Sequence, residues 1–266
     1  MDLGDKYVKL VEYIKSLEKI VVAFSGGVDS TFLLKAAKDA LGDGLIALTI
    51  HAPFHPQREI EEAKALARAL DVNHIILEQE EISPDIQHNP GDRCYICKKA
   101  IFKDIIDFAK NNNYPYIADG SNYDDTKDYR PGMKALRELD ILSPLLKFAF
   151  TKTEIRDLSK KLGLPTWDKP PYPCLLTRIQ YGQEITKEDL LKIEEAEGIL
   201  FSLGFPMARV RLHNQLVRLE VAPDRLMDFL QEDIITRVVK DFKNIGFQYI
   251  TVDLEGYRMG SQNEVL

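Results

Sequence analysis

The chain has 266 residues, of which 45% are hydrophobic and 29% are charged, and its formal net charge is −7. This composition is typical of a globular protein with one large core or two smaller ones. The acidic balance argues against broad electrostatic binding of nucleic acid, and no apolar run approaches the roughly 18 residues of a membrane span. The segment Met1–Lys6 lacks the basic and apolar regions of a signal peptide, so we expect a cytoplasmic protein.

Apolar strands alternate with amphipathic helices through the first part of the chain. Helices are predicted over residues 5–18, 57–70 and 97–110, with another beginning at Thr31, and strands over 20–23, 44–50, 73–77 and 116–119. This alternation indicates an α/β fold with a parallel, doubly wound sheet and helices on both faces. Polar residues follow the four strands, namely Ser25, His51, Glu78 and Asp119. Because ligands bind such sheets beyond the carboxyl ends of the strands, we expect a site there.

A glycine-rich loop joins the first strand to the helix that follows it. It reads Phe24-Ser25-Gly26-Gly27-Val28-Asp29-Ser30. Glycine lets the backbone approach an anion closely, and free N–H groups at a helix start receive phosphate oxygens. The serines add hydroxyl donors, and Asp29 is placed to hold Mg²⁺. The alternative is a helix capped by Ser25 with glycines that only tighten a turn, but the strand–loop–helix setting favours a nucleotide site.

This loop lacks the Gly-Lys-Ser/Thr ending of a Walker loop and resembles the PP-loop of ATP pyrophosphatases. Members of that superfamily adenylylate an oxygen of the substrate and release pyrophosphate, which the loop cradles. The resemblance implies an ATP site built from Ala23, Ser25, Gly26, Gly27, Asp29 and Ser30. It also places the adenine at the end of the second strand, where His51 could stack. His51 and His55 flank Pro53, but two histidines on a loop are more often surface residues than metal ligands.

The loop after the fourth strand carries a G-x-N-x-x-D pattern that starts at Gly120. Turn-forming residues alone produce polar loops of this kind. However, the pattern recurs in PP-loop enzymes together with a Ser-Pro-Leu segment and a helix, found here at Ser143 and Thr151. The resemblance therefore implies that Gly120 completes the nucleotide pocket, with Lys152 and Arg130 as phosphate partners.

A proline-rich crossover follows, with four prolines between Pro165 and Pro173, which excludes a helix. We place a domain boundary here, with residues 1–168 as the ATP domain and 169–266 as a smaller α+β domain. The second domain is predicted to contain helices over 186–203 and 224–240, strands over 208–212 and 216–221 joined by a turn, and a strand over 247–254.

Three cysteines are present. Cys94 and Cys97 form a C-x-x-C at a helix start, beside Arg93, which favours thiolates, and Cys174 lies in the proline-rich loop. The pair alone could be a redox pair, half a zinc site, part of an iron–sulfur site, or two incidental thiols. Three thiolates without an obvious fourth suit an iron–sulfur cubane with one open iron better than a closed zinc site.

Four segments in succession resemble the LarE family of ATP-dependent sulfur transferases: the PP-loop, Pro165–Pro170, Cys174–Gly182 and Arg209–Arg211. That family makes the nickel-pincer nucleotide cofactor. It adenylylates a carboxylate of pyridinium-3,5-biscarboxylic acid mononucleotide and replaces it with a thiocarboxylate. The resemblance implies ATP and Mg²⁺ as cofactors, an adenine nucleotide alpha hydrolase-like fold, and a second domain for sulfur transfer and oligomerisation. Relatives assemble as hexamers, so we expect a homo-oligomer.

Some family members donate the sulfur of one cysteine, matching Cys174, and keep a dehydroalanine. This sequence resembles instead the three-cysteine members, in which the three thiolates hold a [4Fe–4S] cluster. The resemblance implies that Cys94, Cys97 and Cys174 are those ligands here. We therefore expect sulfide carried on the open iron, with the three cysteines as catalytic ligands.

The resemblance also assigns the substrate phosphate to Arg178, Arg209 and Arg211, with Glu197, Glu220 and Asp228 nearby. From the residues alone, Arg209 and Arg211 are better explained as part of a solvated strand face. Rival functions are a tRNA thiolase, a nitrogen-transferring ligase, and a module that binds ATP without turnover. The acidic balance counts against the first, and the cysteines and arginines count against the others.

Overall fold

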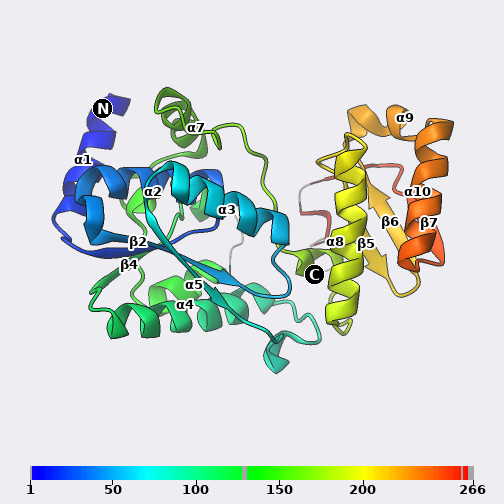
Figure 1. Cartoon of the computed structure of the whole chain (residues 1–266), viewed down its shortest axis with the longest axis horizontal. Coiled ribbons are helices and arrows are strands. Elements are labelled where there is room, and N and C mark those ends of the chain that lie inside the picture. Colours follow the sequence, from blue (N-terminus) through cyan, green and yellow to red (C-terminus); the bar gives the residue numbers. More distant parts are fainter. Residues whose placement is uncertain (1, 128–130, 259, 263–266) are drawn as a thin grey trace. The chain divides into compact units, whose positions relative to one another are not determined.

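The computed structural model describes residues 2–127, 131–258 and 260–262 (Figure 1). Arg130, predicted to contact phosphate, lies outside these ranges. The chain forms two compact units, the first made of Met1–Glu80 and Asp92–Tyr172, the second of Glu81–Gly91 and Pro173–Leu266. The chain thus leaves the first unit after Glu80, returns at Asp92 and leaves again after Tyr172, whereas the sequence placed one boundary after residue 168.

The first unit contains a sheet of four strands with helices on both faces. Its elements are α1 (Leu3–Lys15), β1 (Ile20–Ala23), α2 (Val28–Leu41), β2 (Leu45–His51), α3 (Gln57–Ala69), β3 (Asn73–Glu78), α4 (Arg93–Asn111), β4 (Tyr116–Ala118), α5 (Gly132–Glu138), α6 (Pro144–Lys147) and α7 (Lys152–Lys161). All strand pairs are parallel, in the order β3-β2-β1-β4. The predicted α/β fold class is confirmed.

Helices α1, α2 and α7 lie over one face of this sheet and α4 and α5 over the other (Figure 1), and an apolar cluster packs each set against the strands. One cluster joins α1, α2 and α7 through residues such as Ile14, Phe32 and Ile155, and the other joins α4 and α5 through Phe102 and Leu136. β1 and β2 are buried along nearly their whole length, which is why they read as continuous apolar runs, whereas β3 and β4 at the edges are only partly buried. β1 is central, and the chain turns from it toward β2 on one side, while β4 lies on the other. The loops after β1 and β4 therefore lie next to each other at the carboxyl edge of the sheet, where ligands bind such folds.

The second unit contains a smaller sheet of three strands beside helices. Its elements are η4 (Leu175–Arg178), α8 (Lys187–Ser202), β5 (Arg209–His213), β6 (Leu216–Glu220), η5 (Pro223–Arg225), α9 (Leu226–Phe229), α10 (Glu232–Ile245) and β7 (Tyr249–Val252). β5 and β6 are antiparallel, as predicted for the hairpin, and β7 is parallel to β6. Asn214 adopts φ 56° in the turn, a conformation that asparagine tolerates.

Three predicted boundaries were wrong. The helix predicted over 224–240 is interrupted, because Gln231 has an extended backbone with ψ 143° between α9 and α10. The strand predicted over 247–254 is shorter, since only Tyr249–Val252 pairs with β6. The helix predicted from residue 97 begins at Arg93, so that Cys94 and Cys97 both lie on α4.

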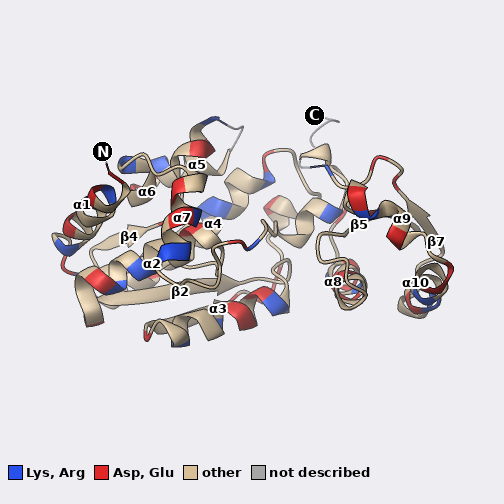
Figure 2. Cartoon of the chain, turned by 90° about the horizontal axis from the view of Figure 1, so that it is seen from above, with Lys and Arg blue, Asp and Glu red and all other residues tan. Residues whose placement is uncertain are grey.

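Charged residues of both signs are mixed along the helices (Figure 2). On α3, for example, Arg58 pairs with Glu62 at 3.6 Å and Lys64 with Glu61 at 2.7 Å. No helix among the described residues combines the length and the apolar character that crossing a membrane requires.

Candidate active site

The PP-loop runs from the end of β1 to the first turn of α2. Gly27 is the N-cap of α2, and Gly26 has a positive φ of 69°. A Cβ atom at Gly26 would lie 3.2 Å from the Cβ of Ala63 on α3. Glycine is needed at position 26 because the backbone is left-handed there and α3 packs directly against it.

Hydroxyl and amide groups converge inside this loop. Ser30 Oγ accepts a hydrogen bond from the Ser25 N–H at 3.3 Å and lies 3.1 Å from Ser25 Oγ. The Gly27 N–H donates to Ser25 Oγ over a long 3.4 Å. These groups lie at the positive end of the α2 dipole, with Ser25 exposed, and such an arrangement binds anions.

The loop after β4 touches the start of α2, backbone against backbone. A Cβ atom at Gly120 would lie 2.9 Å from the backbone nitrogen of Ser30. Buried Asp119 fixes the loop by accepting hydrogen bonds from the hydroxyls of Ser121 at 2.5 Å and Ser143 at 2.6 Å. The topology therefore brings Gly120 and the PP-loop together.

Lys152 and Asp29 form an ion pair at this edge, with Nζ 2.6 Å from Oδ2. Lys152 begins α7, and its backbone N–H also donates to the carboxylate of Asp124 at 2.7 Å. The preceding Thr151 forms a capping box with Glu154, which fixes the helix start. A carboxylate and an ammonium thus lie side by side at the PP-loop, and their predicted roles toward Mg²⁺ and phosphate stay predictions.

His51 ends β2, and its Nδ1 lies 2.7 Å from the carboxylate of Glu78, its partner in the register of β3. The neighbouring His55 accepts the Ala52 N–H through Nδ1 at 3.2 Å. Burial, and secondarily the charge of His51, lowers the pKa of His55 to about 4, so His55 is neutral near pH 7. Within the described residues, no group of three or more histidine, cysteine, aspartate or glutamate side chains could hold a metal ion.

Cys94 and Cys97 lie one turn apart on α4, so they share one face of the helix. Cys94 is exposed and Cys97 is partly buried. Cys174 belongs to the second unit, where it is the partly buried N-cap of η4. The grouping of the three thiols around one cluster therefore stays a prediction.

Arg178 is buried in the second unit and makes a forked ion pair with Glu197, at 2.7 and 2.9 Å. Its Nη1 donates to the carbonyl of Pro173 at 3.0 Å and to the hydroxyl of Thr177 at 2.7 Å. Glu197 lies on α8 and also accepts the N–H of Val210 at 3.0 Å. The segment that contains Cys174 is thereby fastened to α8 and β5.

The other two predicted arginines lie on β5. Arg211 donates to Glu220 on β6 at 2.8 Å and to the backbone carbonyl of Thr177, while Arg209 stacks over the ring of Tyr257 at 5.1 Å. Both arginines are buried, so the interpretation as a solvated strand face was wrong. Their binding of a substrate phosphate stays a prediction.

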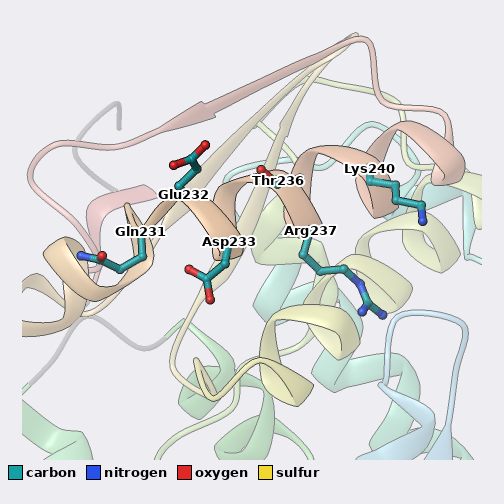
Figure 3. Close-up of a pocket in the computed structure, with 6 residues that line it drawn as sticks. All are labelled: Gln231, Glu232, Asp233, Thr236, Arg237 and Lys240. Carbon is teal, nitrogen blue, oxygen red and sulfur yellow. The ribbon is translucent and has the colours of Figure 1, made fainter.

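Asp228, predicted to lie near the substrate, is exposed on α9, where it pairs with Arg225 at 2.7 Å. A shallow hollow in the second unit follows α10 (Figure 3). Its lining side chains are all exposed and include no predicted site residue: Gln231, Glu232, Asp233, Thr236, Arg237 and Lys240. We assign this surface no role.

Sequence reasoning gave no role to two residues with many polar contacts. Asn89 is buried with φ 46°, and its Nδ2 donates to the carbonyls of Ile179 at 2.7 Å and Gln180 at 3.0 Å. Lys169 makes three contacts beside the PP-loop. The only sequence signal for Lys169 was its place in the Pro165–Pro170 segment, and Asn89 had none.

A glycine loop at the carboxyl edge of a parallel sheet, with Asp29 and Lys152 beside it, defines an ATP-using enzyme of the PP-loop class. Residues 19–89, which contain this loop, match the family model described as queuosine biosynthesis protein QueC. The chain is 38% identical over 266 residues to the pyridinium-3,5-bisthiocarboxylic acid mononucleotide synthase of Lactiplantibacillus plantarum, covering 99% of this chain and 96% of the synthase. It belongs to the family of that synthase, the LarE family.

Two other relatives are similar over different shares of their length. An uncharacterised protein of Synechocystis sp. is 40% identical over 265 residues, covering 99% of both chains. A GMP synthase of Aeropyrum pernix is 28% identical over 221 residues, but these cover 74% of this chain and only 42% of that enzyme. Similarity to the GMP synthase is thus partial, whereas similarity to the family of the synthase extends over nearly the whole chain.

Proposed function

We propose that this protein adenylylates a carboxylate of pyridinium-3,5-biscarboxylic acid mononucleotide with ATP and converts it to a thiocarboxylate, as a step in nickel-pincer nucleotide synthesis. The observation that carries the proposal is the 38% identity, over nearly both full lengths, to a synthase named for the bisthiocarboxylic acid product. The PP-loop geometry of the first unit supports the ATP-dependent half of this reaction.

In the first step, a carboxylate oxygen of the substrate attacks the α-phosphorus of ATP, and pyrophosphate leaves. We propose that the Gly27 N–H and the hydroxyls of Ser25 and Ser30, which lie together at the start of α2, bind the leaving pyrophosphate. We propose that Asp29 holds Mg²⁺, with Lys152 as a phosphate partner. The acyl-adenylate then contains AMP as a good leaving group, which a carboxylate lacks, so a sulfur nucleophile can attack the acyl carbon.

The sulfur is proposed to come from a centre held by Cys94, Cys97 and Cys174. The donor set fits in part, because two of the thiols share a helix face one turn apart, and three thiolates leave one iron of a [4Fe–4S] cluster without a protein ligand. When bound, such a cluster supplies inorganic sulfide. The chain itself holds Cys174 in place through Arg178. This arginine donates to the carbonyl of Pro173, the residue before Cys174, and pairs with Glu197 on α8.

We propose that arginines of the second unit bind the phosphate of the substrate. Arg178 already directs its Nε, Nη1 and Nη2 donors at Glu197, Pro173 and Thr177, so we propose it mainly supports the other two. Arg209 and Arg211 are the proposed direct ligands, since arginine forms forked hydrogen bonds to phosphate.

The test is pyrophosphate release from ATP, measured with and without the pyridinium dicarboxylate mononucleotide, together with the mass of the product. Release that depends on this substrate, and a carboxylate oxygen replaced by sulfur, is the expected result. An Asp29→Asn variant is the control and should release little pyrophosphate. Release that depends on tRNA instead would establish the alternative function, a tRNA thiolase.

The sulfur source is tested separately by iron and acid-labile sulfide per chain after anaerobic purification, beside Cys94→Ala. We expect the wild type to contain iron and sulfide in the proportion of a cubane, and Cys94→Ala to lose both. Protein that is iron-free, folded and active, and that carries dehydroalanine at position 174 after turnover, would instead make Cys174 the consumed donor.

We also propose that the chain is a cytoplasmic homo-oligomer, a hexamer by resemblance. Sedimentation velocity tests this, and a monomer at micromolar concentration would contradict it.

A further inference from the structure

Lys169 lies beside the PP-loop, although it follows the loop by 143 residues. Its Nζ is 2.8 Å from Glu59 Oε2, 2.7 Å from Glu62 Oε2 and 3.3 Å from the carbonyl oxygen of Gly26. The two acids lie one turn apart on α3, the helix against which Gly26 packs. Lys169 thus joins α3 to the peptide between the two glycines of the loop.

An ammonium group has three N–H donors, and Lys169 has three acceptors around it. Two of those acceptors are carboxylates, which offset its positive charge. Lys169 is therefore poorly suited to bind phosphate directly, because doing so would break one of these contacts.

The contact with Gly26 has a geometric consequence for the next residue. In a trans peptide the C=O of one residue and the N–H of the next point in opposite directions, and the described chain contains no cis peptide. Holding the Gly26 carbonyl toward Lys169 therefore turns the Gly27 N–H toward the opposite side. There the N–H meets only the long 3.4 Å contact with Ser25 Oγ, inside the loop. Glycine on both sides makes this peptide easy to flip, so an external contact is needed to fix it.

The segment that contains Lys169 is itself held in place. Arg156 on α7 donates to the carbonyls of Trp167 at 2.7 Å and Lys169 at 2.8 Å. Lys160, also on α7, lies over the Trp167 ring at 4.4 Å. Pro170 follows directly and restricts the backbone. The position of the Lys169 ammonium is thus set by α7 and α3 together.

We propose that Lys169 is a positioning residue for ATP: by binding the Gly26 carbonyl, it fixes the Gly26–Gly27 peptide so that the Gly27 N–H faces the β- and γ-phosphates. The inference rests on the proposed use of ATP by this loop. It concerns the pyrophosphate part of ATP and not the adenosine or the α-phosphate. AMP, which lacks that part, is therefore the matched comparison ligand.

The experiment measures the dissociation constants of Mg²⁺-pyrophosphate and of AMP by titration calorimetry on the full chain. Lys169→Met, which keeps the apolar stem, should bind pyrophosphate about 10- to 100-fold more weakly, the usual effect of losing a hydrogen bond to a charged group. Its affinity for AMP should change less than about threefold. Lys169→Arg, which keeps the charge and the donors, should recover part of the affinity for pyrophosphate.

Two further variants test whether Lys169 acts on the peptide, by offsetting the charge of the two acids, or by holding α3 in place. Removing Lys169 leaves the carboxylates of Glu59 and Glu62 unpaired beside the loop, and these could repel pyrophosphate. Glu59→Gln and Glu62→Gln are therefore made alone and in combination with Lys169→Met. If Lys169 acts on the peptide, this triple variant stays weak, and Glu59→Gln/Glu62→Gln alone binds pyrophosphate at least as well as the wild type.

Recovery of pyrophosphate binding in the triple variant would show repulsion by the acids and overturn the proposal. Equal weakening in the double glutamine variant would show a scaffold role and overturn it as well. A wild-type chain that binds neither ATP nor pyrophosphate overturns the proposed ATP-dependent function, whereas wild-type binding with an unaffected Lys169→Met overturns only this inference.

Discussion

At the scale of single residues, Gly120 sets how closely two loops meet at the nucleotide site. Gly120→Ala would place a Cβ atom 2.9 Å from the Ser30 nitrogen, so the backbone of one loop must shift. We expect ATP to bind at least about tenfold more weakly, because the shifted groups are those proposed to bind phosphate. Calorimetric titration with ATP measures this.

The matched control is Gly198→Ala on α8, where an added Cβ meets no atom within 4 Å. Alanine favours a helix interior by about 1 kcal/mol over glycine, so this variant should be as stable as the wild type or more so. Normal ATP affinity in Gly120→Ala would show that the two loops do not depend on this close approach.

His55 predicts a pH dependence of folding. Its pKa is about 4 in the folded protein, against 6.5 for an ordinary histidine, so the unfolded chain binds more protons between these values. Folding stability is therefore lost as the pH falls from about 6.5 to 4. From pH 7 to pH 5 the loss due to His55 should be about 1–2 kcal/mol.

The measurement is urea unfolding at both pH values for the wild type and for His55→Asn, whose side-chain oxygen can still accept the Ala52 N–H. All other titrating groups are common to both chains, so the difference between their losses of unfolding free energy from pH 7 to pH 5 reports His55. Equal losses would show that His55 is protonated in the folded protein at pH 5.

The glycine-rich loop at the start of α2 could be predicted from the sequence, because the glycines and serines of the PP-loop are contiguous. Lys169 could not, since its partner Glu59 is 110 residues away and its own neighbours indicate only a turn. The burial of Arg209 and Arg211 was missed for a different reason. Alternating charged and apolar residues predict a strand with one exposed face, but β5 is buried on both faces.

At the scale of elements, the pair Arg178–Glu197 joins η4 to α8. Arg178→Met leaves the Glu197 carboxylate buried without its guanidinium, which typically costs about 3–5 kcal/mol. The double variant Arg178→Met/Glu197→Gln should recover part of this loss, because no unpaired charge stays buried. Chemical denaturation of both variants checks the prediction, and a single variant as stable as the wild type would contradict it.

Elements with strong apolar periodicity, such as the strands of the first unit and the hairpin of the second, were predicted close to their observed bounds. The break between α9 and α10 was not, because residues 226–240 keep a helical pattern through Gln231. Backbone geometry at one polar residue decides this break, and a helical period cannot show it.

At the scale of the whole molecule, the first unit is interrupted by Glu81–Gly91, which belongs to the second. Ile86 and Asn89 in this segment are 2% and 0% exposed, and Asn89 is bonded to residues beyond Cys174. A chain ending at Tyr172 should therefore fold and bind ATP only when Glu81–Gly91 is replaced by a glycine–serine linker of equal length. Thermal unfolding with and without ATP measures this. Equal behaviour of the shortened chain with its natural segment would contradict the assignment.

The prolines after Pro165 lie where the chain passes from the first unit to the second, but no pattern marked the earlier passage, because Glu81–Gly91 reads as an ordinary polar loop. Whether such a loop belongs to its neighbours or to a distant part of the chain depends on contacts that form only in the folded protein.

This interruption also bears on synthesis at the ribosome. Gln87 and Asn89 form hydrogen bonds with residues that lie 97 and 87 positions further along the chain and are synthesised later. At about 5–20 residues per second, this segment stays uncovered for roughly 4–20 s. During this time the strands on either side of it can already pair, β3 with β2 and β4 with β1. A nascent chain therefore presents Ile86 to chaperones during this interval, and slow translation of the region after Tyr172 would prolong that exposure.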